Sequence, residues 1–187
     1  MARALPAALK ANIARGAQMA TISASTGTPT RRRKPSGRQK SLANRILAGL
    51  LSLHGGNVNI PELRLSSGFA NESRIDLWSI DPSPATGNVA TAYEIKISRD
   101  DWKRDNAIKQ RGARLFADRF YYVTPPGLLK PEEIPDWAGL IEVDPDEKDA
   151  WDNLVRCKTI VTAPKLDKAH PTWGLVVSML RRVPMEV

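Results

Sequence analysis

The sequence predicts an α/β domain in which a mixed β-sheet is flanked by helices, with a flexible basic arm in front of it. Two observations support this class. Apolar residues at helical spacing alternate along the chain with short runs of β-branched and aromatic residues, in the order helix, strands, helix, strand. In addition, the 187 residues suffice for one domain with a real core and a tail.

The arm is predicted to span residues 1–39, and the domain residues 40–187. No Asp or Glu precedes Glu62, whereas ten of the 28 Lys and Arg residues do, so the whole excess charge of +8 lies at the front of the chain. Such an arm suits a nucleic-acid backbone. Its centre could contact phosphates or could be a solvated charge run; it consists of Arg31, Arg32, Arg33 and Lys34.

Two locations are compatible with this composition. The single Cys157 excludes an internal disulfide, and two His residues make no zinc cluster, which favours a reducing cytoplasm. The arm is nevertheless Arg-rich and acid-free like an organelle transit peptide, with Leu5, Leu9 and Ile13 at helical spacing. No apolar run approaches the roughly 18 residues that cross a bilayer, so no membrane partner is expected.

The domain is predicted to begin with a helix over residues 40–53, in which Leu42, Ile46, Leu50 and Leu53 share one face. The segment His-Gly-Gly at 54–56 is expected to end it. An extended segment over 58–65 follows. Residues 73–80 and 89–98 then read as an antiparallel hairpin, joined by a turn region at 81–88 that contains two prolines.

After the hairpin the spacing becomes helical. A single helix is predicted over residues 99–118, because Ser98 is a good N-cap and Asp101 stands three residues further on. Three more strands are expected at 119–124, 139–143 and 156–163, followed by a terminal helix at 172–183.

The second hairpin strand contains charges where apolar residues could stand. Tyr93 and Ile95 share one face of this strand, so Glu94 and Lys96 share the other. Pairing of the two strands brings Asp76 towards them, although the long turn leaves the register open. Two neighbouring buried carboxylates repel each other, and a divalent cation relieves this repulsion. We therefore expect Mg²⁺ or Mn²⁺ there, while Lys96 binds phosphate, orients water or helps to deprotonate it.

Asp76, followed eighteen positions later by Glu94-Ile95-Lys96 on a hairpin that leads into a helix, resembles the signature of the PD-(D/E)XK nuclease superfamily. The resemblance implies a restriction-endonuclease-like fold and metal-dependent phosphodiester hydrolysis. It also implies that Asp76, Glu94 and the main-chain carbonyl of Ile95 hold the metal. Some members place a further glutamate in the first helix; residues 40–53 have none, and Glu62 or Glu72 could substitute for it.

A closer resemblance covers residues 72–144. The blocks RIDLWSI, YEIKISRDDWKRD, DRFYYVTPPGLL and PEEIPDWAGLIEVD occur in the order seen in the MmcB-type family of DNA-repair nucleases of bacteria and their phages. This implies a role in DNA repair, recombination or phage DNA processing, in the cytoplasm of a bacterial or phage-infected cell.

The predicted helix at 99–118 carries residues that could contact DNA phosphates, and in related nucleases one polar residue of this helix faces the site. The candidates are Lys103, Lys109, Gln110 and Arg111. Local ion pairs, such as Asp105 with Lys109, are the alternative for any one of them.

Two classes of function remain open: a Mg²⁺-dependent DNA nuclease that uses Asp76, Glu94 and Lys96, or a non-catalytic DNA-binding protein on the same scaffold. The sequence leaves open whether the protein acts as a monomer or a homodimer.

Overall fold

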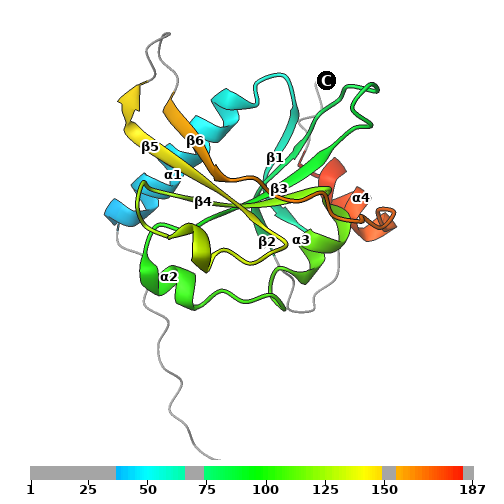
Figure 1. The fold of residues 1–187 in the computed structure, drawn as a ribbon. Helices are drawn as coiled ribbons and strands as arrows, with labels where there is room; N and C mark the ends of the chain where they lie inside the picture. The colour runs from blue at the N-terminus through cyan, green and yellow to red at the C-terminus, as the bar shows by residue number, and fades with distance from the viewer. Residues whose placement is uncertain (1–36, 66–73, 149–154, 183–187) are drawn as a thin grey trace, which may run out of the picture. The chain divides into compact units, whose positions relative to one another are not determined.

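A six-stranded mixed sheet forms the centre of the computed structural model, which describes residues 37–65, 74–148 and 155–182 (Figure 1). The strands lie side by side in chain order: β1 (Val58–Arg64), β2 (Arg74–Ile80), β3 (Ala90–Ile95), β4 (Arg119–Thr124), β5 (Gly139–Lys148) and β6 (Val155–Val161). Strand β4 is parallel to both of its neighbours, and the other adjacent pairs are antiparallel. The predicted class, a mixed sheet flanked by helices, is confirmed.

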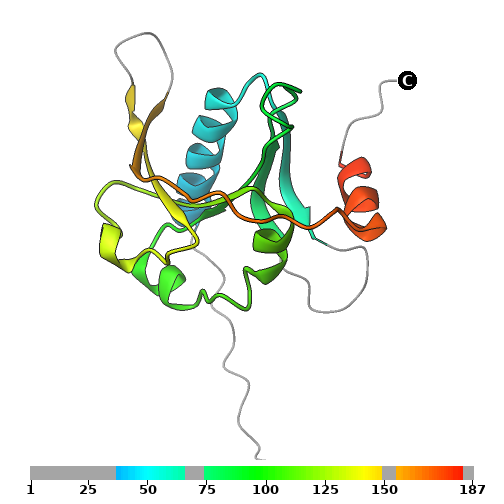
Figure 2. The ribbon, with the colours of Figure 1, turned by 45° about the vertical axis from the view of Figure 1, so that its right-hand side comes forward.

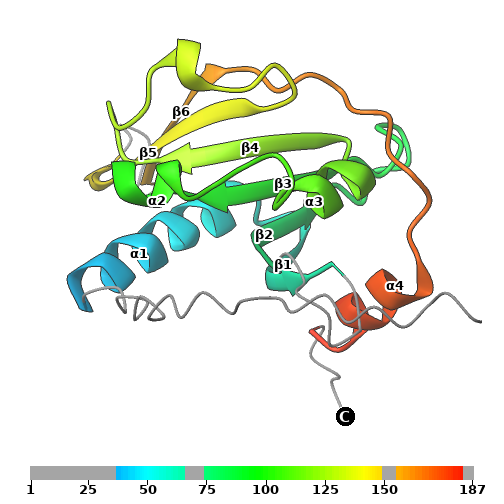
Figure 3. The ribbon, with the colours of Figure 1, turned by 90° about the horizontal axis from the view of Figure 1, so that it is seen from below.

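Helices lie on both faces of this sheet. They are α1 (Gly37–Leu53), α2 (Arg99–Lys103), α3 (Arg111–Phe116) and α4 (Trp173–Leu180), with a short 3-10 helix η2 (Pro131–Glu133). Helix α1 crosses one face (Figure 2), whereas α2 and α3, which connect β3 to β4, lie on the other face (Figure 3). All described residues belong to one compact unit, Pro35–Val187.

The α1 face forms the first of two cores. Ile46 and Leu50 of α1 are fully buried against Leu77, Tyr93 and Ile95 of the sheet. These strand residues alternate with the polar ones that face the other side, as predicted for β3. Helix α1 ends at Leu53, directly before the predicted stop at residues 54–56.

The opposite face forms the second core. Trp78, Ala92 and Phe120 of the sheet pack with Ala113 of α3. Asp76 and Glu94 belong to this face by strand alternation, because each lies two positions from a residue of this core. The two acids therefore lie beside the apolar layer that α3 covers, where Glu94 is buried and Asp76 is half-buried.

The predicted hairpin is confirmed, and the structure supplies its register. Strands β2 and β3 pair from Ile80↔Ala90 to Leu77↔Tyr93. The turn between them is closed by Gly87 and the adjacent Asn88, both in the left-handed region (φ 80° and 53°) that glycine and asparagine tolerate best.

The prediction of one continuous helix over residues 99–118 is wrong. Ser98 caps α2 as expected, its side chain accepting from the Asp101 amide at 3.2 Å, but α2 ends at Lys103. The Asn106 side chain accepts from the Lys109 amide at 2.9 Å, which replaces a helical bond with a local turn. The side chain of Asp105 turns inward at the same point and is buried. The break therefore places polar side chains against the sheet and not on a solvated helix face.

Smaller differences concern the ends of elements. Strand β5 runs five residues beyond the predicted 139–143, and α4 begins one residue after the start and ends three residues before the end of the predicted 172–183. The arm at 1–39 is described only from Gly37, where α1 begins, so its basic centre lies outside the described residues, as does Glu72. None of the helices in the described part is long and apolar enough to cross a membrane.

Candidate active site

A row of polar residues crosses four strands on the α3-bearing face. The pairs Pro61↔Leu77 and Leu63↔Ile75 place Glu62 opposite Asp76. Continuing the β2–β3 register by one position from Leu77↔Tyr93 places Asp76 opposite Glu94, which in turn pairs with Tyr122 of β4. The two predicted carboxylates are therefore neighbours on one face.

Asp76 is fixed at the point where β2 and β3 separate. Its Oδ2 accepts a hydrogen bond from the Ile95 amide at 2.8 Å. Burial raises the pKa of Asp76 to about 7, and the negative charge of Glu94 adds to the shift, while the Ile95 amide and the charge of Lys96 oppose it. The main chain of Ile95 thus borders the site as predicted; its role as a carbonyl ligand stays a prediction.

Lys96 lies between two buried carboxylates. Its Nζ is 2.8 Å from Glu94 Oε1 and 3.2 Å from Asp105 Oδ2, and its side chain is only 2% exposed. Burial alone lowers the pKa of this amine, but the charge and hydrogen bond of Glu94 and the charge of Asp105 outweigh it, so the net pKa is raised. With these protein charges, Lys96 is a cation at neutral pH and donates hydrogen bonds rather than accepting a proton.

Asp105 is the site residue that the sequence analysis missed. It is as buried as Lys96, and Gln110 Nε2 donates to both of its carboxylate oxygens at 2.9 and 3.0 Å. The Tyr122 hydroxyl is hydrogen-bonded to it as well. Burial, followed by the charge of Asp105, raises the pKa of Tyr122, which therefore stays protonated. The only sign of Asp105 in the sequence was its i, i+4 spacing from Lys109. The two form an ion pair of 3.7 Å, which is longer than the 3.2 Å between Asp105 and Lys96.

The predicted DNA contacts divide into two groups. Lys103 and Arg111 are exposed, and Lys109 is 43% exposed with its Nζ 3.1 Å from Glu94 Oε1. Gln110, in contrast, is only 1% exposed and its amide donates to Asp105, so its role as a DNA contact stays a prediction. Together with Asp105, it is one of two polar side chains of this segment that are buried beside the site.

Glu62 lies beside Asp76 in the row but does not join it. Its carboxylate forms an ion pair of 2.7 Å with Arg74, and its backbone has a φ of 56°, which is unusual for this residue type. Its charge still contributes to the raised pKa of Asp76, as the weakest of the causes. Glu62 therefore acts on the site through its field and not through a shared contact.

A divalent cation fits this set of donors. Oε2 of Glu94 is buried without a hydrogen-bond partner, and Asp76 is held beside the same charge. Within the described residues, no group of three His, Cys, Asp or Glu side chains could hold a metal. Magnesium commonly needs only one or two carboxylates and keeps several waters, so two carboxylates and a main-chain oxygen suffice.

The raised pKa of Asp76 predicts a pH-dependent stability. Between the ordinary pKa of 3.8 and the folded value of about 7, the folded chain keeps a proton that the unfolded chain has lost. Stability from this group is therefore complete below pH 3.8 and is lost as the pH rises through 7. In chelating buffer at pH 8, we expect Asp76→Asn to raise the free energy of unfolding by about 2 to 4 kcal/mol, and this gain to vanish near pH 4.

Urea unfolding at several pH values measures this effect. Asp167→Asn is the matched control, since Asp167 is exposed and the substitution removes the same charge. A gain for Asp76→Asn that does not change between pH 4 and pH 8 would contradict the assignment of the raised pKa.

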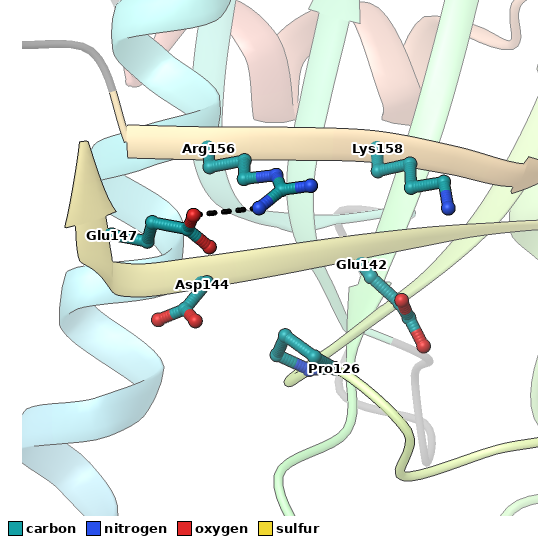
Figure 4. A pocket seen from close by; sticks show the side chains of 6 residues that line it. All are labelled: Pro126, Glu142, Asp144, Glu147, Arg156 and Lys158. Carbon is teal, nitrogen blue, oxygen red and sulfur yellow. Dashed lines mark hydrogen bonds and ion pairs between the residues drawn. The ribbon is translucent and has the colours of Figure 1, made fainter. Parts of the chain in front are cut away.

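A polar hollow lies away from this cluster, where β5 and β6 pair (Figure 4). Its own acids are engaged: Glu147 pairs with Arg156 at 2.6 Å, and Glu142 accepts from the Gly127 amide at 2.7 Å. It shares no residue with the Asp76–Glu94 cluster, being lined by Pro126, Glu142, Asp144, Glu147, Arg156 and Lys158.

Comparison with known proteins adds little to this geometry. No protein-family model matches the chain, and no curated protein matches it either. Among solved structures, a protein of unknown function from Silicibacter pomeroyi is similar at 24% identity, over 75% of this chain and 80% of that chain, with a TM-score of 0.49. A likeness of this extent assigns no function, so the resemblance to the PD-(D/E)XK superfamily stays a prediction from the sequence.

Proposed function

We propose that the protein is a metal-dependent DNA nuclease that hydrolyses phosphodiester bonds in DNA repair, recombination or phage DNA processing. One observation carries the proposal: Asp76 and Glu94 are neighbours on one sheet face, and the amine of Lys96 touches the second of them. Glu94 and Lys96 are buried and Asp76 is half-buried. This arrangement is costly for a purely structural role, because each charge loses hydration.

Each residue has a part in this proposal. Asp76, Glu94 and the Ile95 carbonyl would hold Mg²⁺ or Mn²⁺, as the donor set allows. When bound, the metal supplies a Lewis acid for the phosphate and lowers the pKa of water. Lys96, a cation that keeps free donor capacity, would bind the scissile phosphate and stabilise the charge that develops on it.

Exposed cations from the end of α2 to the start of α3 would hold the DNA backbone. Lys103 and Arg111 are free to reach solvent, and Lys109 already lies at the rim of the site with its amine on Glu94. Contacts of this kind position DNA without reading its sequence. We therefore expect binding that weakens steeply with salt.

One observation favours the alternative, a non-catalytic DNA-binding protein. Both Lys96 and Lys109 contact the same oxygen of Glu94, so the protein's own cations neutralise one predicted metal ligand. In that case the cluster would be structural and the exposed cations would bind DNA without cleavage.

Cleavage assays separate the two functions. Linear, circular, flapped and four-way DNA would be incubated with Mg²⁺, with Mn²⁺ and with excess chelator, and the products and the bound fraction measured side by side. The nuclease cleaves at least one substrate with either metal and none with chelator. Binding to all substrates without cleavage by any metal would favour the alternative.

A further inference from the structure

We infer that Asp105 is a positioning residue, an inference that rests on the proposed metal site. Asp105 holds the Lys96 amine in place when a metal cation binds Glu94. In the structure Lys96 is shared, with Glu94 Oε1 at 2.8 Å and Asp105 Oδ2 at 3.2 Å. A lysine amine has three donors and can bond both acids at once.

A cation at Asp76 and Glu94 changes this balance. The metal cation would bind the carboxylate of Glu94, which already forms ion pairs with the ammonium groups of Lys96 and Lys109. Lys109 is 43% exposed and can move into solvent or onto a phosphate. Lys96 is only 2% exposed and cannot move into solvent, so without Glu94 its amine needs a second buried anion. Asp105 is the acid that meets this need.

The surroundings of Asp105 fit this task. Both of its oxygens are held by Gln110, and the Tyr122 hydroxyl bonds it from the sheet. The ring of Tyr122 is itself fixed edge-on by Trp102, with ring centres 4.7 Å apart. The carboxylate is therefore anchored by neutral groups and keeps its place whichever bond Lys96 makes with Glu94.

The break between α2 and α3 explains how Asp105 reaches Lys96. Its amide closes the end of α2 by bonding the Trp102 carbonyl at 2.9 Å, and the side chain of Asn106 starts the next turn. In a continuous helix, Asp105 and Gln110 would be separated by 140° around the axis and would not share one site. The break between α2 and α3 thus allows Asp105 and Gln110 to lie in the same cluster.

A double-mutant cycle on metal affinity tests the inference without using cleavage. The variants are Asp105→Asn, Lys96→Met and the pair, and the affinity for Mn²⁺ alone is measured by calorimetry on the full chain. We expect Asp105→Asn to weaken Mn²⁺ binding about tenfold, since Lys96 then stays on Glu94. In the Lys96→Met background the same change should have almost no effect, because no amine remains to be held.

Two outcomes would overturn the inference while leaving the nuclease proposal intact: an equal loss with and without Lys96, which marks Asp105 as merely structural, or no loss in either background. A wild-type chain that binds no Mn²⁺ would overturn both. Coupling without cleavage of any DNA would support the role of Asp105 and reject the nuclease. If Asp105→Asn does not fold, Gln110→Leu replaces it, because it removes both anchoring bonds and should show the same dependence on Lys96.

Discussion

Glu94→Gln is expected to abolish metal-dependent cleavage. The substitution keeps the shape of the side chain and an oxygen for Lys96, but it removes the charge that would hold the metal. A bound metal stabilises the transition state by several kcal/mol, and each 1.36 kcal/mol changes the rate about tenfold, so we expect a loss of about 1,000-fold or more. The initial rate of cleavage in Mg²⁺ measures it.

Its control is Glu132→Gln, which makes the same chemical change at an exposed position in η2. That variant should cleave at the wild-type rate. DNA binding, measured in chelating buffer, should be equal in both variants and the wild type. Cleavage by Glu94→Gln within tenfold of the wild-type rate would remove Glu94 from the chemistry.

Lys96→Met is expected to separate catalysis from metal binding. Removal of the amine leaves Glu94 without its closest cation, so Mn²⁺ should bind at least as tightly as before. Cleavage should fall about 100- to 1,000-fold, as when one preorganised donor to a developing charge is lost. Cleavage rate and Mn²⁺ affinity, measured on the same preparation, give the two values.

The same substitution should destabilise the fold when no metal is added. Breaking a buried ion pair usually costs about 3 to 5 kcal/mol, and we expect about 2 to 3 here because Lys109 still contacts both acids. Lys165→Met, at an exposed position outside the cluster and the proposed DNA contacts, is the control and should change neither stability nor rate by much. Loss of Mn²⁺ binding together with cleavage would contradict the separate roles.

The parts of the fold that follow strong local patterns could be predicted. The spacing of apolar residues identified α1, and the alternation in residues 91–98 correctly placed Tyr93 and Ile95 on one face and Glu94 and Lys96 on the other. These patterns are strong because one face of each element is buried. The N-cap at Ser98 was equally clear, since a side chain and an amide three residues apart suffice to form it.

The register of the hairpin and the break after α2 could not be predicted. The long turn at 81–89 permits several pairings, and only tertiary packing places Asp76 opposite Glu94. The break depends on Asp105, whose burial is offset by Lys96, Gln110 and Tyr122 from three different segments. Helical spacing contains no information about such partners, so the burial of Asp105 could not be predicted from the sequence.

The most direct test of the proposed centre is diffraction from crystals soaked in Mn²⁺, recorded at wavelengths where manganese scatters anomalously. We predict one strong peak in contact with carboxylate oxygens of both Asp76 and Glu94, with the amine of Lys96 displaced from Glu94 and bonded to Asp105. No peak there at saturating Mn²⁺, with Lys96 still bound to Glu94, would contradict a metal site at this pair of acids.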